Sequence, residues 1–274
     1  MTDLTRNQKV AVLGTGKIGE ALLSGMIRAG WAPADLLITA RRAERAEELR
    51  DRYGVEAVSN PEAAKAADTL ILAAKPQDMG ALLEELVPHV AADRLVISAA
   101  AGIPTTYFEE RLAEGIAVVR VMPNTPVLVD EGMSVISAGR HASEAHLART
   151  EAIFQPVGKT LRVPEKQQDA ATALSGSGPA YFYYLVEAMT DAGILLGLPR
   201  AQAHDLIVQA AIGAAVMLRD SGEHPVKLRE AVTSPAGTTI SAIRELENHG
   251  VRAALIAALE AARDRSRELA SGNG

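Results

Sequence analysis

The residues Leu228–Glu247 combine an interrupted helix with hydroxyl side chains, a pattern that can bind an anion. Apolar residues at helical spacing stop at a proline, which cannot continue a helix, and resume after Gly237, which lets the backbone turn. A new helix N-terminus there would present unpaired N–H groups beside the hydroxyls of Ser234, Thr238 and Thr239. Such an end binds a carboxylate or a phosphate without a cationic side chain. The alternative is a kinked structural helix with ordinary threonine capping.

A second pattern lies near the N-terminus, where the apolar run Val10–Leu13 leads into a glycine-rich turn. The candidate cofactor-binding residues of this turn are Leu13, Gly14, Thr15, Gly16, Lys17, Ile18 and Gly19. In a GxGxxG turn the first glycine makes the tight turn, the second lets the backbone approach a pyrophosphate, and the third allows close helix–strand packing. Glycines also mark ordinary turns, but this position between a strand and a helix favours a dinucleotide site.

The residues after the second strand bear on the type of nucleotide. About twenty residues past the glycines, an NAD site usually has Asp or Glu for the ribose hydroxyls. Here Arg41 and Arg42 follow Thr39 and Ala40, and no acid is present. Arginines at this position suit the additional phosphate of NADP. We therefore expect NADPH as the cofactor, with NADH as the second choice; the alternative is that one of the two arginines is merely a solvated residue.

The chain changes character near residue 167. Before it, apolar runs alternate with helical segments, which predicts a parallel sheet with helices on both faces. After it we find only helical segments. The predicted fold class is an α/β Rossmann-type dinucleotide-binding domain over 1–167, followed by an all-α domain over 168–274. The predicted strands are Val10–Leu13, Leu36–Ala40, Leu70–Ala73, Leu95–Ala99, Ala117–Met122, Ser134–Ala138 and Thr160–Val163. The predicted C-terminal helices are Pro179–Leu196, Arg200–Arg219, Val226–Ala231, Thr239–Glu247 and Val251–Leu269.

Composition argues against several classes of protein. The 274 residues carry a net charge of −6, which is unlike a nucleic-acid binder, and no cysteine, which excludes thiolate metal sites and disulfides. The six histidines are scattered, so we expect no metal site. The N-terminus has no apolar stretch typical of a signal peptide, and the longest apolar run is far shorter than the ~20 residues that span a bilayer. We expect a cytoplasmic protein without a membrane partner. Residues 205–218 are apolar nearly all round, which predicts burial against a partner subunit.

The interrupted helix closely resembles the signature of the pyrroline-5-carboxylate reductases, which reduce a cyclic imine to proline. A second segment, Ser175–Tyr181, reads SGSGPAY and matches the same family letter for letter. Without the resemblance, this segment would be a turn at the domain junction with Ser177 as N-cap. The resemblance implies that Ser177, Gly178 and Pro179 border the substrate and the nicotinamide. It also implies that the restarted helix holds the substrate carboxylate. The substrate-binding residues there would be Ser234, Gly237, Thr238 and Thr239.

The resemblance extends the cofactor site to loops after three further strands. It implies that an asparagine contacts the adenosine side, that a Lys-Pro motif lines the cofactor, and that a Pro-Asn pair lies beside the nicotinamide. The residues so assigned are Asn60, Ala73, Ala74, Lys75, Pro76, Pro123 and Asn124. Taken by themselves, the same residues could be a helix N-cap, a surface lysine and loop punctuation.

The implied activity is the NADPH-dependent reduction of 1-pyrroline-5-carboxylate to L-proline. Hydride transfer to an imine needs a donor held face-on, a hydrogen-bonded nitrogen and a fixed substrate, but no metal or nucleophile. The resemblance places the hydroxyl of Thr239 close to the imine nitrogen, so Thr239 is the predicted catalytic residue. The family also implies a homodimer with exchanged helical domains that assembles into a larger homo-oligomer. Two alternatives stay open: an NADP-dependent reductase of another imine or small oxo or hydroxy acid, and a non-catalytic dinucleotide-sensing scaffold.

Overall fold

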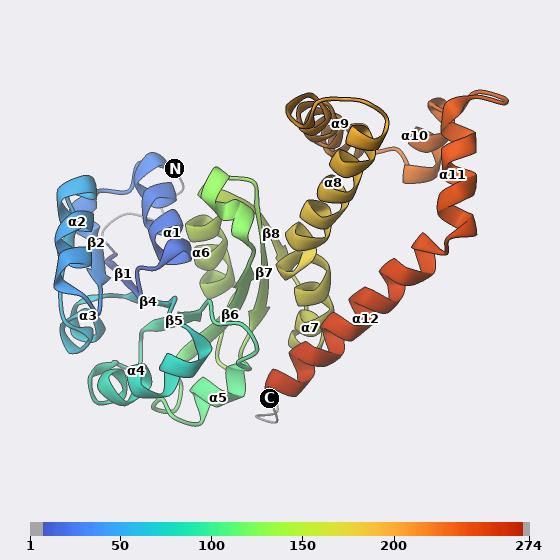
Figure 1. The fold of residues 1–274 in the computed structure, drawn as a ribbon. Coiled ribbons are helices and arrows are strands. Elements are labelled where there is room, and N and C mark those ends of the chain that lie inside the picture. The colour runs from blue at the N-terminus through green and yellow to red at the C-terminus, as the bar shows by residue number, and fades with distance from the viewer. Residues whose placement is uncertain (1–7, 271–274) are drawn as a thin grey trace. The chain divides into compact units, whose positions relative to one another are not determined.

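The computed structural model describes residues 8–270, which divide into two compact units (Figure 1). The first unit comprises residues 8–176 together with 263–270, and the second comprises 177–262. The first unit thus continues to Gly176, past the boundary expected near residue 167, and the last turns of the chain belong to it as well.

An eight-stranded sheet forms the centre of the first unit, with strand order β3-β2-β1-β4-β5-β6-β7-β8. The strands are β1 Val10–Leu13, β2 Leu36–Thr39, β3 Glu56–Ala57, β4 Thr69–Leu72, β5 Leu95–Ser98, β6 Ala117–Pro123, β7 Gly132–Ala138 and β8 Gly158–Arg162. All the predicted strands are present with slightly shifted ends. The short strand β3 was not predicted, since its two residues are too few to give a hydrophobic pattern.

The sheet is parallel from β3 to β6, but β7 runs antiparallel to β6. The alternating pattern predicted a parallel sheet, and this prediction is wrong at the pairing of β6 with β7. The reason is the connection: residues 124–131 are too few for the crossover of a dozen or more residues that parallel strands need. Between β7 and β8 the helix α6 provides such a crossover, so these two strands are parallel to each other.

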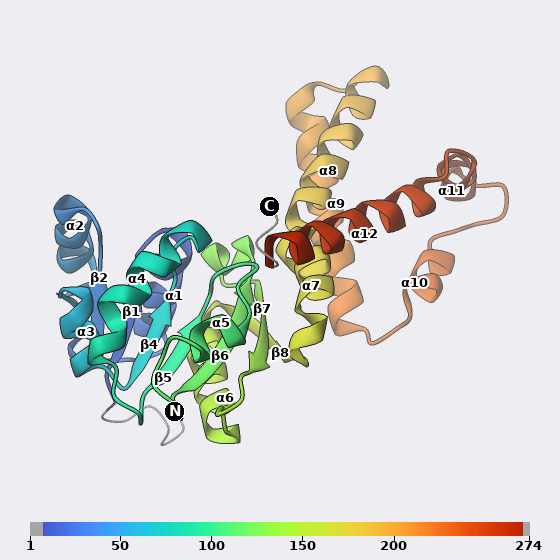
Figure 2. The same ribbon diagram turned by 90° about the horizontal axis from the view of Figure 1, so that it is seen from below.

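Helices cover both faces of this sheet (Figures 1 and 2). They are α1 Lys17–Arg28, α2 Ala43–Tyr53, α3 Asn60–Ala66, α4 Met79–Leu86, α5 Thr105–Glu109 and α6 Glu144–Phe154. Alternate residues of β1 enter different cores: Val10 and Val12 pack with α1, α2 and α6, whereas Ala11 and Leu13 pack with α3, α4 and α5. Burial on both faces explains why the strands read as continuous apolar runs.

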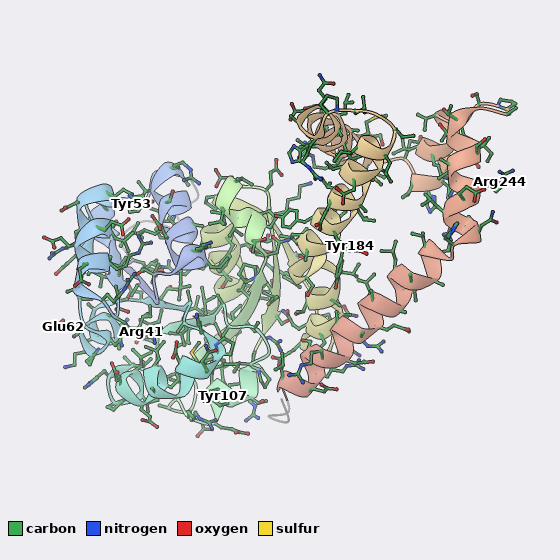
Figure 3. The ribbon with its side chains drawn as sticks, in the orientation of Figure 1. Arg41, Tyr53, Glu62, Tyr107, Tyr184 and Arg244 are labelled. Atoms are coloured by element: carbon green, nitrogen blue, oxygen red, sulfur yellow. The ribbon has the colours of Figure 1, made fainter. Side chains whose placement is uncertain are left out.

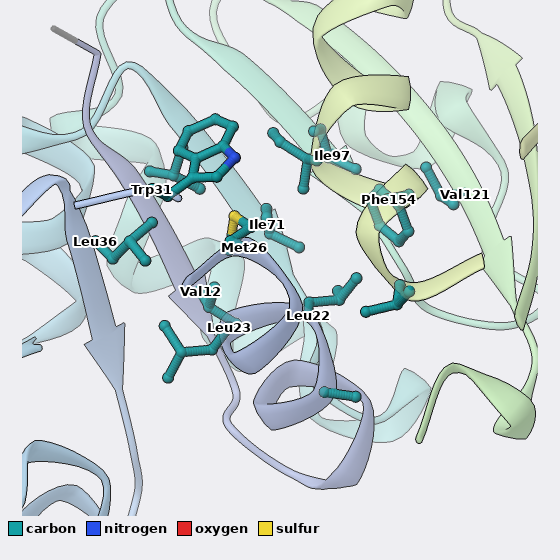
Figure 4. Packing of buried hydrophobic residues seen from close by; sticks show 14 of the residues in the cluster. Val12, Leu22, Leu23, Met26, Trp31, Leu36, Ile71, Ile97, Val121 and Phe154 are labelled. Carbon is teal, nitrogen blue, oxygen red and sulfur yellow. The ribbon is translucent and has the colours of Figure 1, made fainter. Parts of the chain in front are cut away.

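The core on the α1 side contains the chain's one tryptophan (Figure 4). Trp31 packs with Met26 of α1, with Leu36 of β2 and with Ile71 and Ile97 of neighbouring strands, all fully or almost fully buried. This core fixes α1 on the sheet and thereby places the helix N-terminus after the glycine-rich turn.

Helices alone follow β8 in the described chain. They are α7 Gln168–Ala171, a π-helical turn Thr172–Gly176, α8 Gly178–Leu195, α9 Arg200–Asp220, α10 Pro225–Ala231, α11 Thr238–Asn248 and α12 Val251–Ala270. The five predicted helices are present with small shifts at their ends. The last turns of α12 lie in the first unit, where the Ser266 hydroxyl donates a 2.8 Å hydrogen bond to Asp169.

The second unit leaves many large apolar side chains uncovered. Helices α8 and α9 pack closely at Gly193. An added Cβ there would lie only 2.7 Å from the Cβ of Ala203. Yet Tyr184 of α8 (Figure 3) is 72% exposed, and Leu206 of α9 is 62% exposed. Within residues 8–270, α9 is the one helix long and apolar enough to cross a membrane by length and composition. That test carries little weight, since a helix that is buried by a partner subunit has the same composition.

Candidate active site

A cleft of about 860 Å³ lies at the carboxyl ends of β1, β2 and β4 in the first unit. Ligands of open α/β sheets bind at this edge. The predicted cofactor residues that line it are Gly14, Thr15, Gly16, Lys17, Arg41, Arg42, Asn60, Ala73, Ala74 and Lys75. Predicted residues outside the lining are Leu13, Ile18, Gly19, Pro76, Pro123 and Asn124. Four loops that are distant in sequence thus meet around one space, as the motif analysis predicted for most of these residues.

The three glycines of the turn have different surroundings. Gly14 has a φ of +91°, and a Cβ there would lie 2.8 Å from the backbone nitrogen of Ala74. A Cβ on Gly19 would lie 2.6 Å from the carbonyl oxygen of Gly14. At Gly16 nothing lies within 4 Å of an added Cβ, so the space in front of its backbone is open. Gly14 and Gly19 therefore serve the fold, whereas Gly16 leaves room for a ligand at the N-terminus of α1.

Polar contacts hold the turn in place. The buried Thr15 hydroxyl donates a 3.1 Å hydrogen bond to the carbonyl oxygen of Thr39 at the end of β2. From the other side, Arg45 of α2 donates through Nε to the carbonyl oxygen of Thr15 at 3.3 Å. Arg45 also pairs with Glu20 of α1 and with Glu48. These contacts connect α1, α2 and β2 around the turn, so its backbone is fixed before any ligand binds.

Glu20 is the centre of this network. Burial alone would raise the pKa of its carboxyl, but hydrogen bonds from Arg45 and Tyr53, with the charges of Arg45 and Arg52, lower that pKa below its usual value. Arg52 pairs with Glu20 at 2.6 Å, and the Tyr53 hydroxyl donates to it at 3.0 Å. Glu20 and Arg45 were not among the predicted residues. The side chains that bond to Glu20 lie 25 to 33 residues away from it in the sequence, and such distances give no local pattern.

Two carboxylates line the part of the cleft contributed by α4 and the turn before it. Asp78 forms an ion pair with Arg41 at 3.2 Å, and Figure 3 marks this arginine on the loop before α2. Glu85 accepts a 2.8 Å hydrogen bond from the side-chain amide of Asn60. Neither acid was singled out in the sequence. The spacing of Asp78 and Glu85 on one helical segment was the signal that would have placed both on the same side.

The residue before Asn60 is a helix cap. The Ser59 hydroxyl accepts from the backbone N–H of Glu62, and the Glu62 carboxylate accepts from the backbone N–H of Ser59 at 2.9 Å. The N-cap interpretation is therefore correct for Ser59. Because Ser59 and Glu62 supply the cap, the side chain of Asn60 is available to the cleft, where it contacts Glu85.

Asn124, predicted beside the nicotinamide, uses its amide for contacts within the protein. Its Nδ2 donates to the carbonyl oxygen and to the hydroxyl of Ser175, at 3.1 and 3.3 Å, and its Oδ1 accepts from the N–H of Met133 at 2.8 Å. Asn124 thus joins the end of β6 to the beginning of β7 and to the π-helical turn. The contact of Asn124 with the nicotinamide stays a prediction.

The SGSGPAY segment contains the end of a π-helical turn and the start of α8. The predicted glycine-rich helix start is confirmed, since α8 begins at Gly178; the π-helical turn Thr172–Gly176, which follows α7 and ends one residue before the N-cap Ser177, was not predicted. Ser177 is the N-cap residue of α8 and the first residue of the second unit, as the alternative of a turn at the domain junction predicted, although its side chain makes no capping hydrogen bond. Inserted π-helical turns are frequent at functional sites, because they displace side chains and backbone groups from the regular helical pattern.

The predicted helix break is present in the second unit. Helix α10 ends at Ala231, and α11 begins at Thr238 with Gly237 at the N-cap position. No side chain caps this end, so the first N–H groups of α11 are donors without a side-chain acceptor. The left-handed residue of the turn is Ala236, with a φ of +56°, whereas Gly237 is extended at φ −81° and ψ 178°. Gly237 thus closes the turn, through its N–H bond to the carbonyl oxygen of Ser234, but does not adopt its left-handed conformation.

The space around residue 237 explains why a glycine stands there. A Cβ there would lie 2.4 Å from the Ser234 hydroxyl oxygen, so glycine allows the close approach of that side chain. Thr238 is exposed and Thr239 is half-buried at the start of α11. The end of this helix therefore has the composition expected of an anion site: free amide donors together with the hydroxyls of Ser234, Thr238 and Thr239.

Residues 8–270 contain no group of three His, Asp or Glu side chains arranged for a metal ion. Two histidines have local roles at helix starts. The ring of His146 completes a capping box with Ser143, and the ring of His224 accepts from the N–H of Val226 at 3.3 Å. Burial lowers the pKa of His146.

Comparison with known proteins matches both parts of the chain. Residues 165–269 match the family model described as pyrroline-5-carboxylate reductase dimerisation. Residues 9–102 match the model described as NADP oxidoreductase, coenzyme F420-dependent.

Curated relatives and solved structures match almost the whole chain. Pyrroline-5-carboxylate reductase of Corynebacterium melassecola is 46% identical over 264 residues, which cover 95% of this chain and 98% of the relative. That of Mycobacterium leprae is 41% identical, with 97% and 98% covered. The structure of pyrroline-5-carboxylate reductase from Coxiella burnetii superimposes with a TM-score of 0.92 at 34% identity, covering 96% of this chain and 99% of that one. A Plasmodium falciparum pyrroline carboxylate reductase with NADP bound gives 0.86 at 29% identity, covering 97% and 99%.

Proposed function

Since this chain belongs to the pyrroline-5-carboxylate reductase family, we propose that it reduces 1-pyrroline-5-carboxylate to L-proline with NADPH as the hydride donor. The observation that carries the proposal is the pair of ready-made sites that such a reaction needs. One is the open glycine-rich turn at Gly16 in the first unit, and the other is the uncapped helix start at Thr238 in the second. The first suits a nucleotide and the second suits the substrate carboxylate.

The surroundings of the turn fit NADP. The open space at Gly16 admits a pyrophosphate to the N-terminus of α1, where amide N–H groups and the helix dipole favour negative charge. Arg41 and Arg42 line the same cleft and supply cations for a 2′-phosphate. Asn60 and Lys75 stand beside them as polar contacts for the adenosine and the phosphates. When bound, the reduced nicotinamide supplies the hydride; everything else in the reaction is positioning and proton supply.

The substrate would be held by α11 and the segment that precedes it. Amide N–H groups of Thr238 and Thr239 receive the ring carboxylate, aided by the Ser234 hydroxyl. The Thr239 hydroxyl donates a hydrogen bond to the ring nitrogen, which makes the C=N carbon a better hydride acceptor. Since a threonine hydroxyl is a very weak acid, the proton that ends on nitrogen comes from water. The backbone at Ser177, Gly178 and Pro179 borders the ring.

The helical unit mediates self-association in this proposal. Its support is the set of exposed apolar side chains on α8 and α9, among them Tyr184 and Leu206, and the match of this region to a dimerisation model. Exposed apolar patches of this kind mark protein–protein interfaces. The proposed form is a homodimer that assembles into a larger homo-oligomer in the cytoplasm.

A direct assay tests the activity. Purified protein is mixed with NADPH and 1-pyrroline-5-carboxylate, and both the loss of NADPH absorbance and the appearance of L-proline are measured. Open-chain 2-oxo acids and other cyclic imines serve as competing substrates. Faster turnover of one of these would replace the proposed substrate by that compound. Tight binding of NADPH without turnover of any substrate would indicate a nucleotide-sensing scaffold instead.

A further inference from the structure

The cations of the cofactor cleft differ in how far protein carboxylates already neutralise them. Arg45 is paired with Glu20 and Glu48. Arg41 is paired with Asp78 at 3.2 Å. Arg42 makes no ion pair with any residue between 8 and 270. Among the arginines of the cleft, Arg41 differs in one respect within the described residues: its carboxylate partner, Asp78, also lines the cleft.

The position of Asp78 makes its orientation informative. Asp78 ends the short turn Pro76–Asp78 and is the N-cap residue of α4. Its backbone angles are helical, because the turn runs directly into α4, so Asp78 lies within a continuous helical segment. Here its side chain makes no capping hydrogen bond. The carboxylate is directed to Arg41 and to the cleft.

We propose that Asp78 is a specificity-determining residue that competes with the 2′-phosphate of NADP for Arg41 and so restrains the preference for NADPH over NADH. The inference rests on the proposed NADP site. A 2′-phosphate carries about −1.5 to −2 charges near neutral pH. To bind Arg41 it must displace the Asp78 carboxylate and then remain close to that negative charge. NADH has hydroxyls at this position and meets neither cost, so Asp78 acts on one of the two cofactors.

The size of the effect follows from exposure. The Arg41 side chain is 79% exposed and that of Asp78 is 33% exposed, so water and salt screen their interaction. Exposed ion pairs are worth at most about 1 kcal/mol, which corresponds to a factor of roughly five. Repulsion between Asp78 and the doubly charged phosphate adds to this. We therefore expect Asp78→Asn to tighten NADPH binding roughly threefold to tenfold and to change NADH binding less than twofold.

The experiment measures dissociation constants of NADPH and NADH for the full-length protein by calorimetry, at low and at physiological salt. The variants are Asp78→Asn, Asp78→Ser, which also removes the carboxylate, and Glu84→Gln as the matched control. Glu84 is an exposed carboxylate on α4 that does not line the cleft. Thermal unfolding of each variant establishes that it is folded. Both Asp78 variants are expected to favour NADPH selectively, more so at low salt, while Glu84→Gln leaves the ratio of the two constants unchanged.

A double-mutant cycle with Arg41→Ala tests the route of the effect. In that background Asp78→Asn is expected to tighten NADPH binding less than in the wild-type protein, because the competition for Arg41 is gone and only the direct repulsion of the phosphate is relieved. An undiminished effect there would overturn the competition, and so would equal tightening of NADPH and NADH or no change in either.

A failure of the proposed activity can be distinguished from a failure of the inference about Asp78. A protein that binds NADPH but does not reduce 1-pyrroline-5-carboxylate leaves this comparison intact, because its readout is binding. Absence of binding of both nucleotides would overturn the inference together with the cofactor site.

Discussion

Two alanine substitutions in the glycine-rich turn should have opposite consequences. Gly14 has a φ of +91°, which costs an L-residue about 1–2 kcal/mol, and an added methyl group would collide with the Ala74 backbone at 2.8 Å. Forcing such a group into a packed site costs roughly 1–3 kcal/mol more. The Gly14→Ala variant should therefore lose roughly 2–5 kcal/mol of unfolding free energy. For a unit of this size that lowers the melting temperature by roughly 5–15 °C.

The Gly16→Ala variant should instead fold normally and bind its cofactor poorly. Gly16 has a φ of −75°, and nothing lies within 4 Å of an added Cβ. Alanine is a somewhat poorer N-cap residue than glycine, so the loss of stability should stay below about 1 kcal/mol. The new methyl group would stand where a pyrophosphate approaches the helix. We expect NADPH affinity to fall roughly tenfold to a hundredfold.

Melting curves followed by circular dichroism and NADPH titrations of both variants provide the test. The reasoning requires that stability fall in one variant and affinity in the other. A Gly14→Ala protein that melts at the wild-type temperature would refute the strain argument. A Gly16→Ala protein with wild-type affinity would show that the nucleotide does not approach this backbone.

Four further substitutions test separate parts of the structure. Thr239→Ala should reduce kcat roughly tenfold to a hundredfold, as expected for the loss of one oriented hydrogen bond, measured as steady-state NADPH oxidation. Replacing Arg41 and Arg42 together by Ala should raise the KM for NADPH much more than that for NADH. Glu20→Gln should lower the melting temperature near neutral pH, but less at acid pH. The pKa of Glu20 is lowered in the folded state, so its stabilisation is present above its usual pKa near 4.5 and is lost as the pH falls through the folded value. Leu206→Glu should shift the protein to smaller species in size-exclusion chromatography, because a charge would enter the proposed apolar interface.

Three of these four changes have a matched control. Thr239→Ser keeps the hydroxyl, and a loss of rate as large as with alanine would remove the hydrogen bond from the mechanism. The double variant Arg50→Ala and Lys65→Ala removes two exposed charges outside the cleft. If it altered the two KM values like the arginine pair, the pair would act only through net charge. Glu47→Gln, an exposed change on α2, should leave the pH dependence of melting unchanged. An oligomer that tolerates Leu206→Glu would exclude α9 from the interface.

Local sequence predicted the elements whose causes are local. The runs Val10–Leu13 and Leu95–Ser98 are buried on both faces, and continuous apolar residues are the direct sign of such strands. The GxGxxG turn, the strand before it and the helix after it were all predictable, because the three glycines have separate steric reasons within one short segment. The restart of the helix after residue 231 was predictable from Pro235.

Features set by distant contacts were not predictable. The charge of Arg45 is taken up by Glu20, and that of Arg41 by Asp78, across separations that no pattern in a single sequence reveals. Ala236 adopts the left-handed conformation although Gly237 follows it, and an alanine gives no sequence signal for that conformation. The amide of Asn124 is directed to Ser175 by the π-helical turn, which has no sequence signal of its own.

The chain's path through its two units makes the helical part an insertion, with a covalent link to the nucleotide-binding unit at each end. Residues 263–270 return to the first unit, where Ser266 is 6% exposed and bonded to Asp169. A deletion that removed these last turns would therefore cut into the body that carries the cleft rather than trim a helical tail. Conversely, a single proteolytic nick between residues 177 and 262 would leave both fragments rooted in the same folded body.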